Sequence, residues 1–299
     1  MSFLNNAIVS FVKLLPKSVV HIFAKKYIAG EELNDAIDVV KQLNNMGIVA
    51  TIDVLGEAIT TKEEAFAEKE ECIRVLEAIK ENGLNANLSI KPTSLGLNID
   101  KEYFYENLTE IVSKAKSLNN FVRVDMENSP YTSQTIEIFK RVKNEFDNVG
   151  IVLQAYLKRT NKDVEELNKV KTNYRICKGI YIESEKIAIK DKQKIRNNFL
   201  MLLEKMLLNN SYVGIATHDD YLVNGAYELI KKYKLTKDKY EFQMLYGVKE
   251  KLRDQINQNG DKIRIYVPYG KKWYAYSIRR MQENPEIAGQ ITKSIFKLN

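Results

Sequence analysis

The chain has 299 residues, with 46 lysines and arginines against 39 aspartates and glutamates, and therefore a formal net charge of +7. A hydrophobic content of 44% and a charged content of 28% are typical of a soluble globular protein, and they exclude a disordered, collagen-like or small disulfide-rich chain. There are only two cysteines, Cys72 and Cys177, and two histidines, His21 and His218. We therefore expect a cytoplasmic protein with no disulfide framework and no metal site.

The positive charges are dispersed along the chain. Lysines alternate with glutamates at residues 62–64 and 249–251. A nucleic-acid-binding surface would concentrate basic residues on one stripe with aromatic residues among them. We therefore expect a solvated surface and no nucleic-acid partner, although weak attraction to anionic lipid is compatible with the charge.

The first residues predict an amphipathic helix. Apolar residues recur at helical spacing from Phe3 to Leu15, and Pro16 ends the pattern. No basic segment precedes them, no small-residue cleavage site follows, and no stretch reaches the roughly 18 apolar residues that span a bilayer. We expect the apolar face to pack on the protein's own core, with peripheral contact to a membrane surface as the alternative.

Eight short apolar runs rich in β-branched residues alternate with helical segments. The runs cover residues 48–56, 86–92, 121–127, 151–157, 174–182, 212–218, 240–245 and 262–268. The first helical segment opens with a Thr61–Glu64 capping box and stops at Gly83. Further helical periodicity covers residues 133–146, 163–170, 190–208, 221–233 and 271–282.

This alternation, over about 220 residues, predicts an α/β fold of the (β/α)8 TIM-barrel type. The alternative, a doubly wound open sheet, usually has a glycine-rich phosphate loop after its first strand, whereas the first strand here ends in DVLGE. No linker or repeat divides the chain. We therefore predict a single domain over 1–299, a distorted barrel with extra N-terminal helices, in which 1–45 is a helical segment and 46–299 is the barrel with a C-terminal active-site helix.

Polar residues occupy the carboxyl ends of the predicted strands, where barrel enzymes place their active sites. Burying such groups unpaired is costly, so their convergence at one end of a barrel indicates a functional site. His218 alone could be structural, and either Arg175 or Lys178 could pair with a carboxylate for structural reasons. Along a strand that runs to residue 182, Arg175 and Gly179 would face one side and Lys178 the other. The strand-end residues are Asp53, Glu57, Lys91, Asp125, Glu127, Gln154, Arg175, Lys178, Thr217, His218, Gln243 and Tyr266.

The last predicted helix carries a candidate carboxylate-binding face. Tyr276, Arg279, Arg280 and Glu283 are spaced i, i+3, i+4 and i+7. Paired guanidinium groups bind carboxylates through two parallel hydrogen bonds, and Glu283 could hold one of them in place. A solvated basic face is the alternative.

Seven segments in register resemble the proline dehydrogenase family: SIKPTSLG, VRVDMENS, VLQAYLKRT, RICKGIY, IATHD, EFQML and YAYSIRR. The resemblance implies a barrel that holds FAD non-covalently and oxidises L-proline to Δ1-pyrroline-5-carboxylate. It also implies that electrons pass to a membrane quinone, so that the cytoplasmic enzyme would work at the inner face of the membrane.

The resemblance further implies roles for individual residues. Asp125 and Arg175 would be catalytic, with Arg175 near the flavin N5. Ile180 replaces the alanine that the family usually has after Lys-Gly, and this larger side chain could narrow the pocket or move the isoalloxazine. The substrate set is Lys91, Leu245, Tyr266, Tyr276, Arg279, Arg280 and Glu283, and the FAD set is Met126, Gln154, Arg175, Lys178, Gly179, Ile180, Tyr181, Thr217 and His218.

Two other functions stay open on the residues alone. One is a Schiff-base aldolase on the same barrel, with Lys91 or Lys178 as the nucleophile. The other is a basic module that binds nucleic acid or membrane, which would show steep salt dependence and no turnover. The absorbance spectrum of the protein before and after addition of proline distinguishes these hypotheses.

Overall fold

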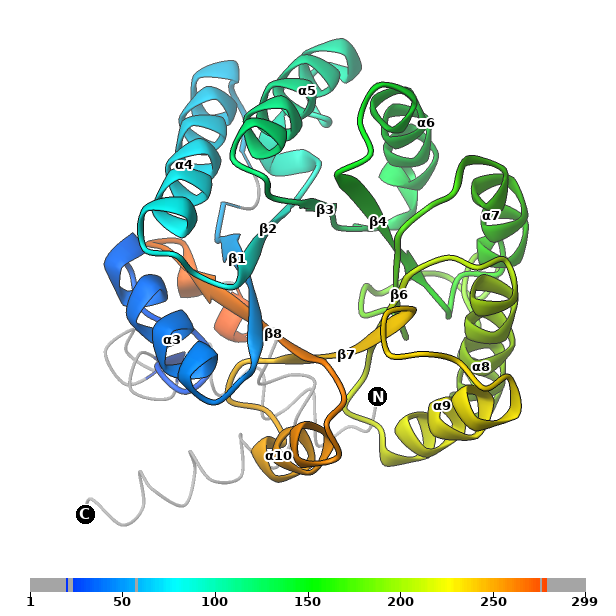
Figure 1. Cartoon of the computed structure of the whole chain (residues 1–299). Coiled ribbons are helices and arrows are strands. Elements are labelled where there is room, and N and C mark those ends of the chain that lie inside the picture. Colours follow the sequence, from blue (N-terminus) through cyan, green and yellow to red (C-terminus); the bar gives the residue numbers. More distant parts are fainter. Residues whose placement is uncertain (1–19, 21–23, 57–58, 275, 279–299) are drawn as a thin grey trace, which may run out of the picture.

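The computed structural model describes Val20 and residues 24–56, 59–274 and 276–278. Within these residues eight parallel strands form a closed barrel in sequential order (Figure 1). This confirms the predicted (β/α)8 fold, and the open-sheet alternative is wrong. The strands are β1 (Val49–Val54), β2 (Ala86–Ile90), β3 (Val122–Val124), β4 (Val149–Gln154), β5 (Tyr174–Cys177), β6 (Val213–Ala216), β7 (Tyr240–Leu245) and β8 (Ile263–Tyr269).

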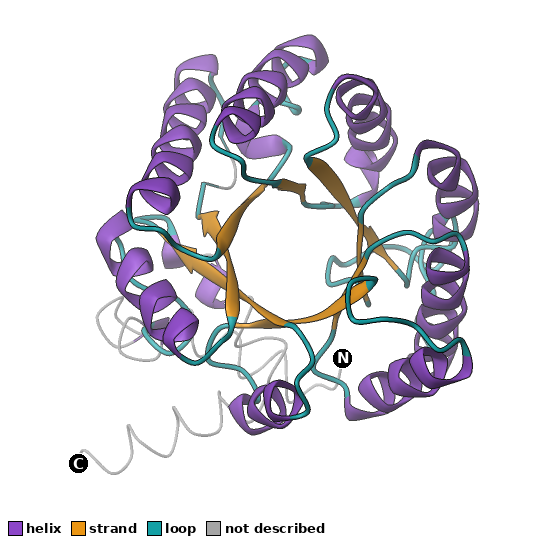
Figure 2. Cartoon of the chain, viewed as in Figure 1, coloured by secondary structure: helices purple, strands orange, loops and turns teal. Residues whose placement is uncertain are grey.

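Helices surround the barrel (Figure 2). One of them, α3, precedes the first strand and packs against β1 and β8, so it closes the ring where the barrel itself closes. The periodicity of the sequence missed α5 and α10. The helices are α3 (Leu33–Asn45), α4 (Lys62–Glu81), α5 (Lys101–Ser117), α6 (Ser129–Glu145), α7 (Thr160–Leu167), α8 (Lys192–Leu208), α9 (Asp220–Lys232) and α10 (Glu250–Gln258), with short 3₁₀ turns η1 (Thr93–Leu95) and η2 (Asn168–Val170).

Both predicted ends of α4 are confirmed. The Glu64 backbone N–H donates to Thr61 Oγ1 at 3.2 Å, and the Thr61 backbone N–H donates to the Glu64 carboxylate at 3.3 Å, which completes the capping box. After the helix, Gly83 adopts a left-handed conformation with φ of 60°. Local signals of this kind work because both partners lie within one turn of the helix.

The predicted strand at 174–182 is too long. β5 ends at Cys177, and the next residues form a loop in which Lys178 and Ile180 are exposed. Gly179 has a φ of 103°, and a Cβ added to it would lie 2.0 Å from the Tyr156 ring. The expected alternation of faces through Gly179 is therefore wrong, because close packing against Tyr156 and a backbone conformation suited to glycine end the strand here.

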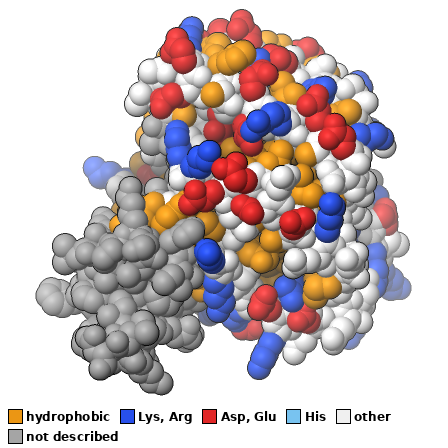
Figure 3. All heavy atoms as spheres, turned by 90° about the vertical axis from the view of Figure 1, so that its left-hand side faces the viewer, with side chains coloured by type: hydrophobic (Ala, Val, Ile, Leu, Met, Phe, Trp, Pro, Cys, Tyr) orange, Lys and Arg blue, Asp and Glu red, His pale blue; other side chains and the backbone are white. Residues whose placement is uncertain are grey.

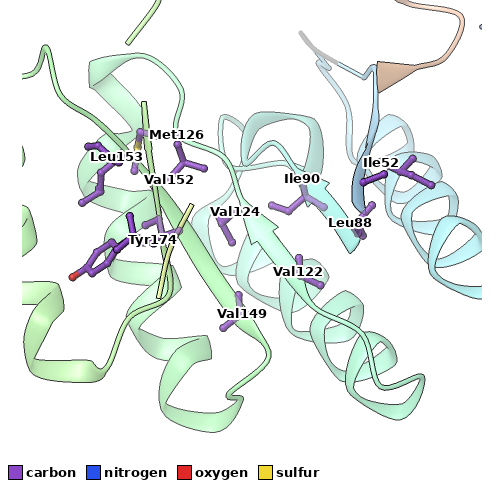
Figure 4. Packing of buried hydrophobic residues seen from close by; sticks show 14 of the residues in the cluster. Ile52, Leu88, Ile90, Val122, Val124, Met126, Val149, Val152, Leu153 and Tyr174 are labelled. Carbon is purple, nitrogen blue, oxygen red and sulfur yellow. The ribbon is translucent and has the colours of Figure 1, made fainter. Parts of the chain in front are cut away.

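The hydrophobic core lies between the strands and the helices. Ile52, Leu88, Val122 and Val149 are fully buried in it (Figure 4). Because successive side chains of a strand point to opposite faces, the intervening residues point to the barrel axis. The buried polar and charged side chains of the strands occupy these intervening positions.

A second, smaller buried cluster lies beside the carboxyl end of β1. It joins Leu55, which follows β1, to Ile28, Trp273, Tyr276 and Ile278. The described residues between 273 and 278 are helical, so the start of the predicted last helix is confirmed. The predicted helix at 3–15 and the residues Arg279, Arg280 and Glu283 lie outside the described residues.

The surface agrees with the dispersed charge of the sequence. On the side of the molecule shown in Figure 3, lysines and arginines are mixed with aspartates and glutamates. In the part of the chain that the structure describes, no helix has the length and apolar character required to cross a bilayer.

Candidate active site

A partly buried carboxylate directly after β3 forms the centre of the site. Asp125 Oδ1 accepts hydrogen bonds from Arg175 Nη1 and from Ser89 Oγ, both at 2.7 Å. Asp125 Oδ2 accepts a third, from the Tyr266 hydroxyl, also at 2.7 Å. Burial, together with Asp125 and Asp53, raises the pKa of Tyr266 well above its ordinary value, so this hydroxyl stays protonated and donates. Strands β2, β3, β5 and β8 thus bring together three predicted site residues, Asp125, Arg175 and Tyr266.

A second ion pair lies next to this centre. Lys91 Nζ donates to both carboxylate oxygens of Asp53, at 2.6 and 2.7 Å, and it lies 3.4 Å from the Tyr266 hydroxyl. Burial is the main cause that raises the pKa of Asp53 to about 6; Lys91 opposes this shift and Asp125 adds to it. The predicted substrate residue Lys91 therefore lies within the same polar cluster as Asp125.

The guanidinium of Arg175 is held from two sides. Its Nε donates to Gln243 Oε1 at 2.5 Å, while its Nη1 donates to Asp125. Gln243 in turn donates to Glu241 at 2.6 Å, and Glu241 forms an ion pair with Arg264 at 2.6 Å. Sequence reasoning placed Gln243 at a strand end without a role, and it missed Glu241 and Arg264. Polar residues at alternate positions of YEFQML and KIRIYVP were a signal that could have identified them.

Another polar cluster lies at the ends of β5 and β6. The Asp219 carboxylate accepts two hydrogen bonds from Arg196, at 2.8 and 2.9 Å, and one from Lys178 at 3.3 Å. It also caps α9 by accepting the backbone N–H of Tyr221 at 3.2 Å. Burial acts to raise the pKa of Asp219, but the two cations outweigh it and lower that pKa. Sequence reasoning missed Arg196, because nothing in a charged helical segment marks one arginine.

The two residues after β6 make contacts within the protein. His218 Nε2 accepts the backbone N–H of Leu245 at 2.9 Å, so it joins the carboxyl ends of β6 and β7. Thr217 Oγ1 accepts the backbone N–H of Asp219 at 3.1 Å. His218 Nε2 therefore has the structural role that the sequence left open for this residue. The family resemblance implies that the same residue also contacts the cofactor.

Two predicted cofactor residues are largely buried. Gln154, at the end of β4, donates through Nε2 to the Glu127 carbonyl oxygen at 2.8 Å and is 2% exposed. Met126 is 6% exposed and belongs to the hydrophobic core (Figure 4). In contrast, Ile180 in the loop after β5 is 40% exposed. Tyr181 follows it and is partly buried.

Two further features were not expected from the sequence. Glu68 of α4 packs against Gly56, where an added Cβ would lie 2.1 Å from the carboxylate. Burial, and next Asp53, raises the pKa of Glu68 to about 8, so at pH 7 this group is mostly neutral. Among the described residues, no three or more histidine, cysteine or acidic side chains gather in a way that could hold a metal ion.

The chain is a closed parallel barrel with paired charges at the carboxyl ends of its strands, which is where (β/α)8 enzymes place their active sites. The family model for proline dehydrogenase matches residues 36–293. The chain is 40% identical over 264 residues to proline dehydrogenase 2 of Bacillus subtilis (strain 168), covering 88% of this chain and 87% of that protein. It is 33% identical over 291 residues to the proline dehydrogenase of Deinococcus radiodurans, covering 96% and 94% of the two chains.

A solved structure shows the same fold. Proline utilization A of Bdellovibrio bacteriovorus, inactivated by N-propargylglycine, superposes with a TM-score of 0.83 at 26% identity, over 88% of this chain and 32% of that one. The chain therefore belongs to the proline dehydrogenase family and is an enzyme of that family. This membership decides against the aldolase and the binding module.

Proposed function

We propose that this enzyme catalyses the first step of proline catabolism, the oxidation of L-proline to Δ1-pyrroline-5-carboxylate, with FAD as the hydride acceptor. Family membership supports the dehydrogenase activity and implies a flavin. The observation that carries the residue assignments is the single cluster that Asp125, Arg175, Tyr266 and Lys91 form at the strand ends.

The chemistry of the donor groups fits a flavin nucleotide. In the described residues, Nε and Nη1 of Arg175 donate within the barrel, which leaves Nη2 to donate to a ligand. Lys178, with a side chain 46% exposed, and Arg196 both contact Asp219 at the N-terminus of α9. The two cations outnumber this carboxylate, and the remaining positive charge would suit a diphosphate. We assign Thr217 and His218 to the phosphate and adenosine end of FAD, and Met126 and Gln154 to the flavin ring. Lys178, Gly179, Ile180 and Tyr181 would line the cofactor site.

The remaining residues would bind and orient proline. Lys91, Arg279 and Arg280 provide positive charge for the substrate carboxylate, with Glu283 supporting the arginines and Leu245, Tyr266 and Tyr276 shaping the pocket. A carboxylate held in this way fixes the ring, and such orientation contributes several kcal/mol to a rate enhancement, on the order of 7–11 kcal/mol at best.

Bound FAD would supply the acceptor for the hydride that leaves the substrate ring carbon. Arg175 would stabilise the negative charge that develops there, and Asp125 would keep the guanidinium in place. The ring nitrogen must be neutral to release a hydride, so we expect the rate of flavin reduction to rise with pH.

An absorbance spectrum tests the proposal. The purified protein, supplied with FAD, should show flavin bands that anaerobic proline bleaches. If the protein binds FAD but proline does not bleach the flavin bands, proline is not the substrate. A protein that takes up no FAD would remove the cofactor assignment.

We propose a membrane quinone as the electron acceptor, with the enzyme at the cytoplasmic face of the membrane. Exposed apolar side chains in the loop after β5 support this: Ile182 is 83% exposed and Ile187 is 38% exposed. A quinone in liposomes should restore the bleached spectrum, and the same quinone should do so more slowly with Ile182→Ser. Equal rates would show that this loop does not meet the acceptor.

A further inference from the structure

We propose that Gln243 is a positioning residue for Arg175: it connects the guanidinium to the buried Glu241–Arg264 ion pair and so fixes the direction in which the positive charge faces the substrate. This inference rests on the proposed function, in which Arg175 stabilises developing charge. It adds a residue that touches neither substrate nor cofactor in that proposal.

The amide of Gln243 has one allowed orientation. Its Oε1 accepts from Arg175 Nε at 2.5 Å, and its Nε2 donates to Glu241 Oε1 at 2.6 Å. An arginine can only donate and an ionised carboxylate can only accept, so a reversed amide would place like groups face to face on both sides. Gln243 is 5% exposed and Glu241 1% exposed, so water is largely kept from both contacts.

The Glu241 carboxylate, to which Gln243 donates, is itself held firmly by Arg264. Glu241 accepts from Arg264 Nε at 2.6 Å and from Nη2 at 3.1 Å, a two-point contact, while Arg264 Nη1 donates to the Ala50 carbonyl oxygen at 2.6 Å. Burial acts to raise the pKa of Glu241, but Arg264 and then Lys262 outweigh it and hold that pKa at about 2. Glu241 therefore stays ionised over the working pH range and always offers an acceptor to Gln243.

The neighbouring strand leaves room for the amide. Gly214 of β6 lies opposite Glu241 in the sheet, and a Cβ added to it would lie 2.4 Å from Gln243 Nε2. A side chain at position 214 would therefore push the amide away without removing any polar group. This provides a steric variant that is independent of substitutions at Gln243 itself.

The two contacts of Arg175 have different roles. Asp125 holds Nη1 and balances the charge, whereas Gln243 holds Nε and carries no charge. Both contacts together fix the plane of the guanidinium, because one contact alone permits rotation about it. Replacing Gln243 with methionine therefore changes the orientation of the positive charge but leaves the net charge of the site as it was.

The test compares FAD-loaded wild type with Gln243→Met and Gly214→Ala. The control is Gln193→Met, at an exposed glutamine of α8 whose side chain donates to Asn197. We expect both test variants to lower the limiting rate of anaerobic flavin reduction by about tenfold or more, since small misplacements near the chemistry cost up to ~10²-fold. The apparent Kd for proline and the FAD content should stay within about threefold of wild type, because the residues assigned to them are unchanged.

A second measurement does not depend on turnover. Sulfite adds to the oxidised flavin at N5 and forms an anion, so its affinity reports a correctly oriented positive charge. In Gln243→Met we expect the Kd for sulfite to rise by about the same factor as the rate of flavin reduction falls. A merely structural role would lower the melting temperature and the FAD content without this selective change.

The outcomes separate this inference from the function on which it rests. A wild type that proline does not bleach would overturn the function. A bleached wild type with Gln243→Met within twofold of it in rate and sulfite affinity would overturn the positioning role alone. If Gln243→Met does not fold, Gly214→Ala decides, and a folded Gly214→Ala with an unchanged rate overturns the role.

Discussion

Replacing Arg175 with methionine removes the positive charge from the centre of the site but keeps most of the side-chain volume. The substitution deletes the hydrogen bonds to Asp125 at 2.7 Å and to Gln243 at 2.5 Å. Asp125 keeps the Ser89 and Tyr266 hydroxyls as donors but loses its counter-ion. The variant therefore tests both the proposed electrostatic role and the stability of a buried pair.

Two magnitudes follow from this geometry. Deleting one preorganised donor that faces developing charge costs about 2.7–4 kcal/mol, which is a 10²–10³-fold lower rate of flavin reduction. Breaking a buried pair by removing one partner costs about 3–5 kcal/mol of the free energy of unfolding. The Asp125 side chain is 15% exposed and keeps two donors, so we expect the lower end of that range, about 3 kcal/mol.

Anaerobic stopped-flow absorbance measures the rate, and urea unfolding measures the stability. Arg141→Met is the matched control, since Arg141 forms a two-point contact with Glu102 on the surface, where its side chain is 37% exposed. We expect the control to lose less than about 1 kcal/mol and none of the rate. If FAD-loaded Arg175→Met reduced its flavin within threefold of the wild-type rate, Arg175 would not act on the reaction.

Three further predictions concern ligand binding. Lys178→Ala should weaken FAD binding by about tenfold in a fluorescence titration of the apoprotein, since a charged contact contributes about 1.5–3 kcal/mol; an unchanged Kd would place the diphosphate elsewhere. The raised pKa of Asp53, about 6, means that this group is ionised above pH 6 and neutral below it, where it no longer neutralises Lys91. A cyclic carboxylate without a ring nitrogen should therefore bind more tightly as the pH falls through 6, by at most about tenfold per pH unit, and a flat profile would separate Asp53 from the substrate site. Arg280→Met should raise the KM for proline by about tenfold or more with FAD content unchanged, and an unchanged KM would remove Arg280 from the carboxylate site.

The sequence predicted the architecture because the signals for it are local. Alternating apolar runs and helical segments, each readable within about ten residues, are enough to indicate a barrel. The capping box at Thr61 and Glu64 and the left-handed Gly83 are confirmed for the same reason, since every partner lies within a few residues. Polar residues at the strand ends could likewise be predicted to converge, because parallel strands of a barrel end on one face.

Only the tertiary structure determined which charged side chains form ion pairs with each other. Nothing local determines that Lys91 pairs with Asp53 while Arg175 pairs with Asp125, because these partners come from different strands and are 38 and 50 residues apart. The early end of β5 depends on the approach of Tyr156 to Gly179, again a contact between separate segments. The place of Gln243 between a cation and a buried carboxylate depends on the barrel closing, because only closure brings the residues on its axis within hydrogen-bond distance of one another.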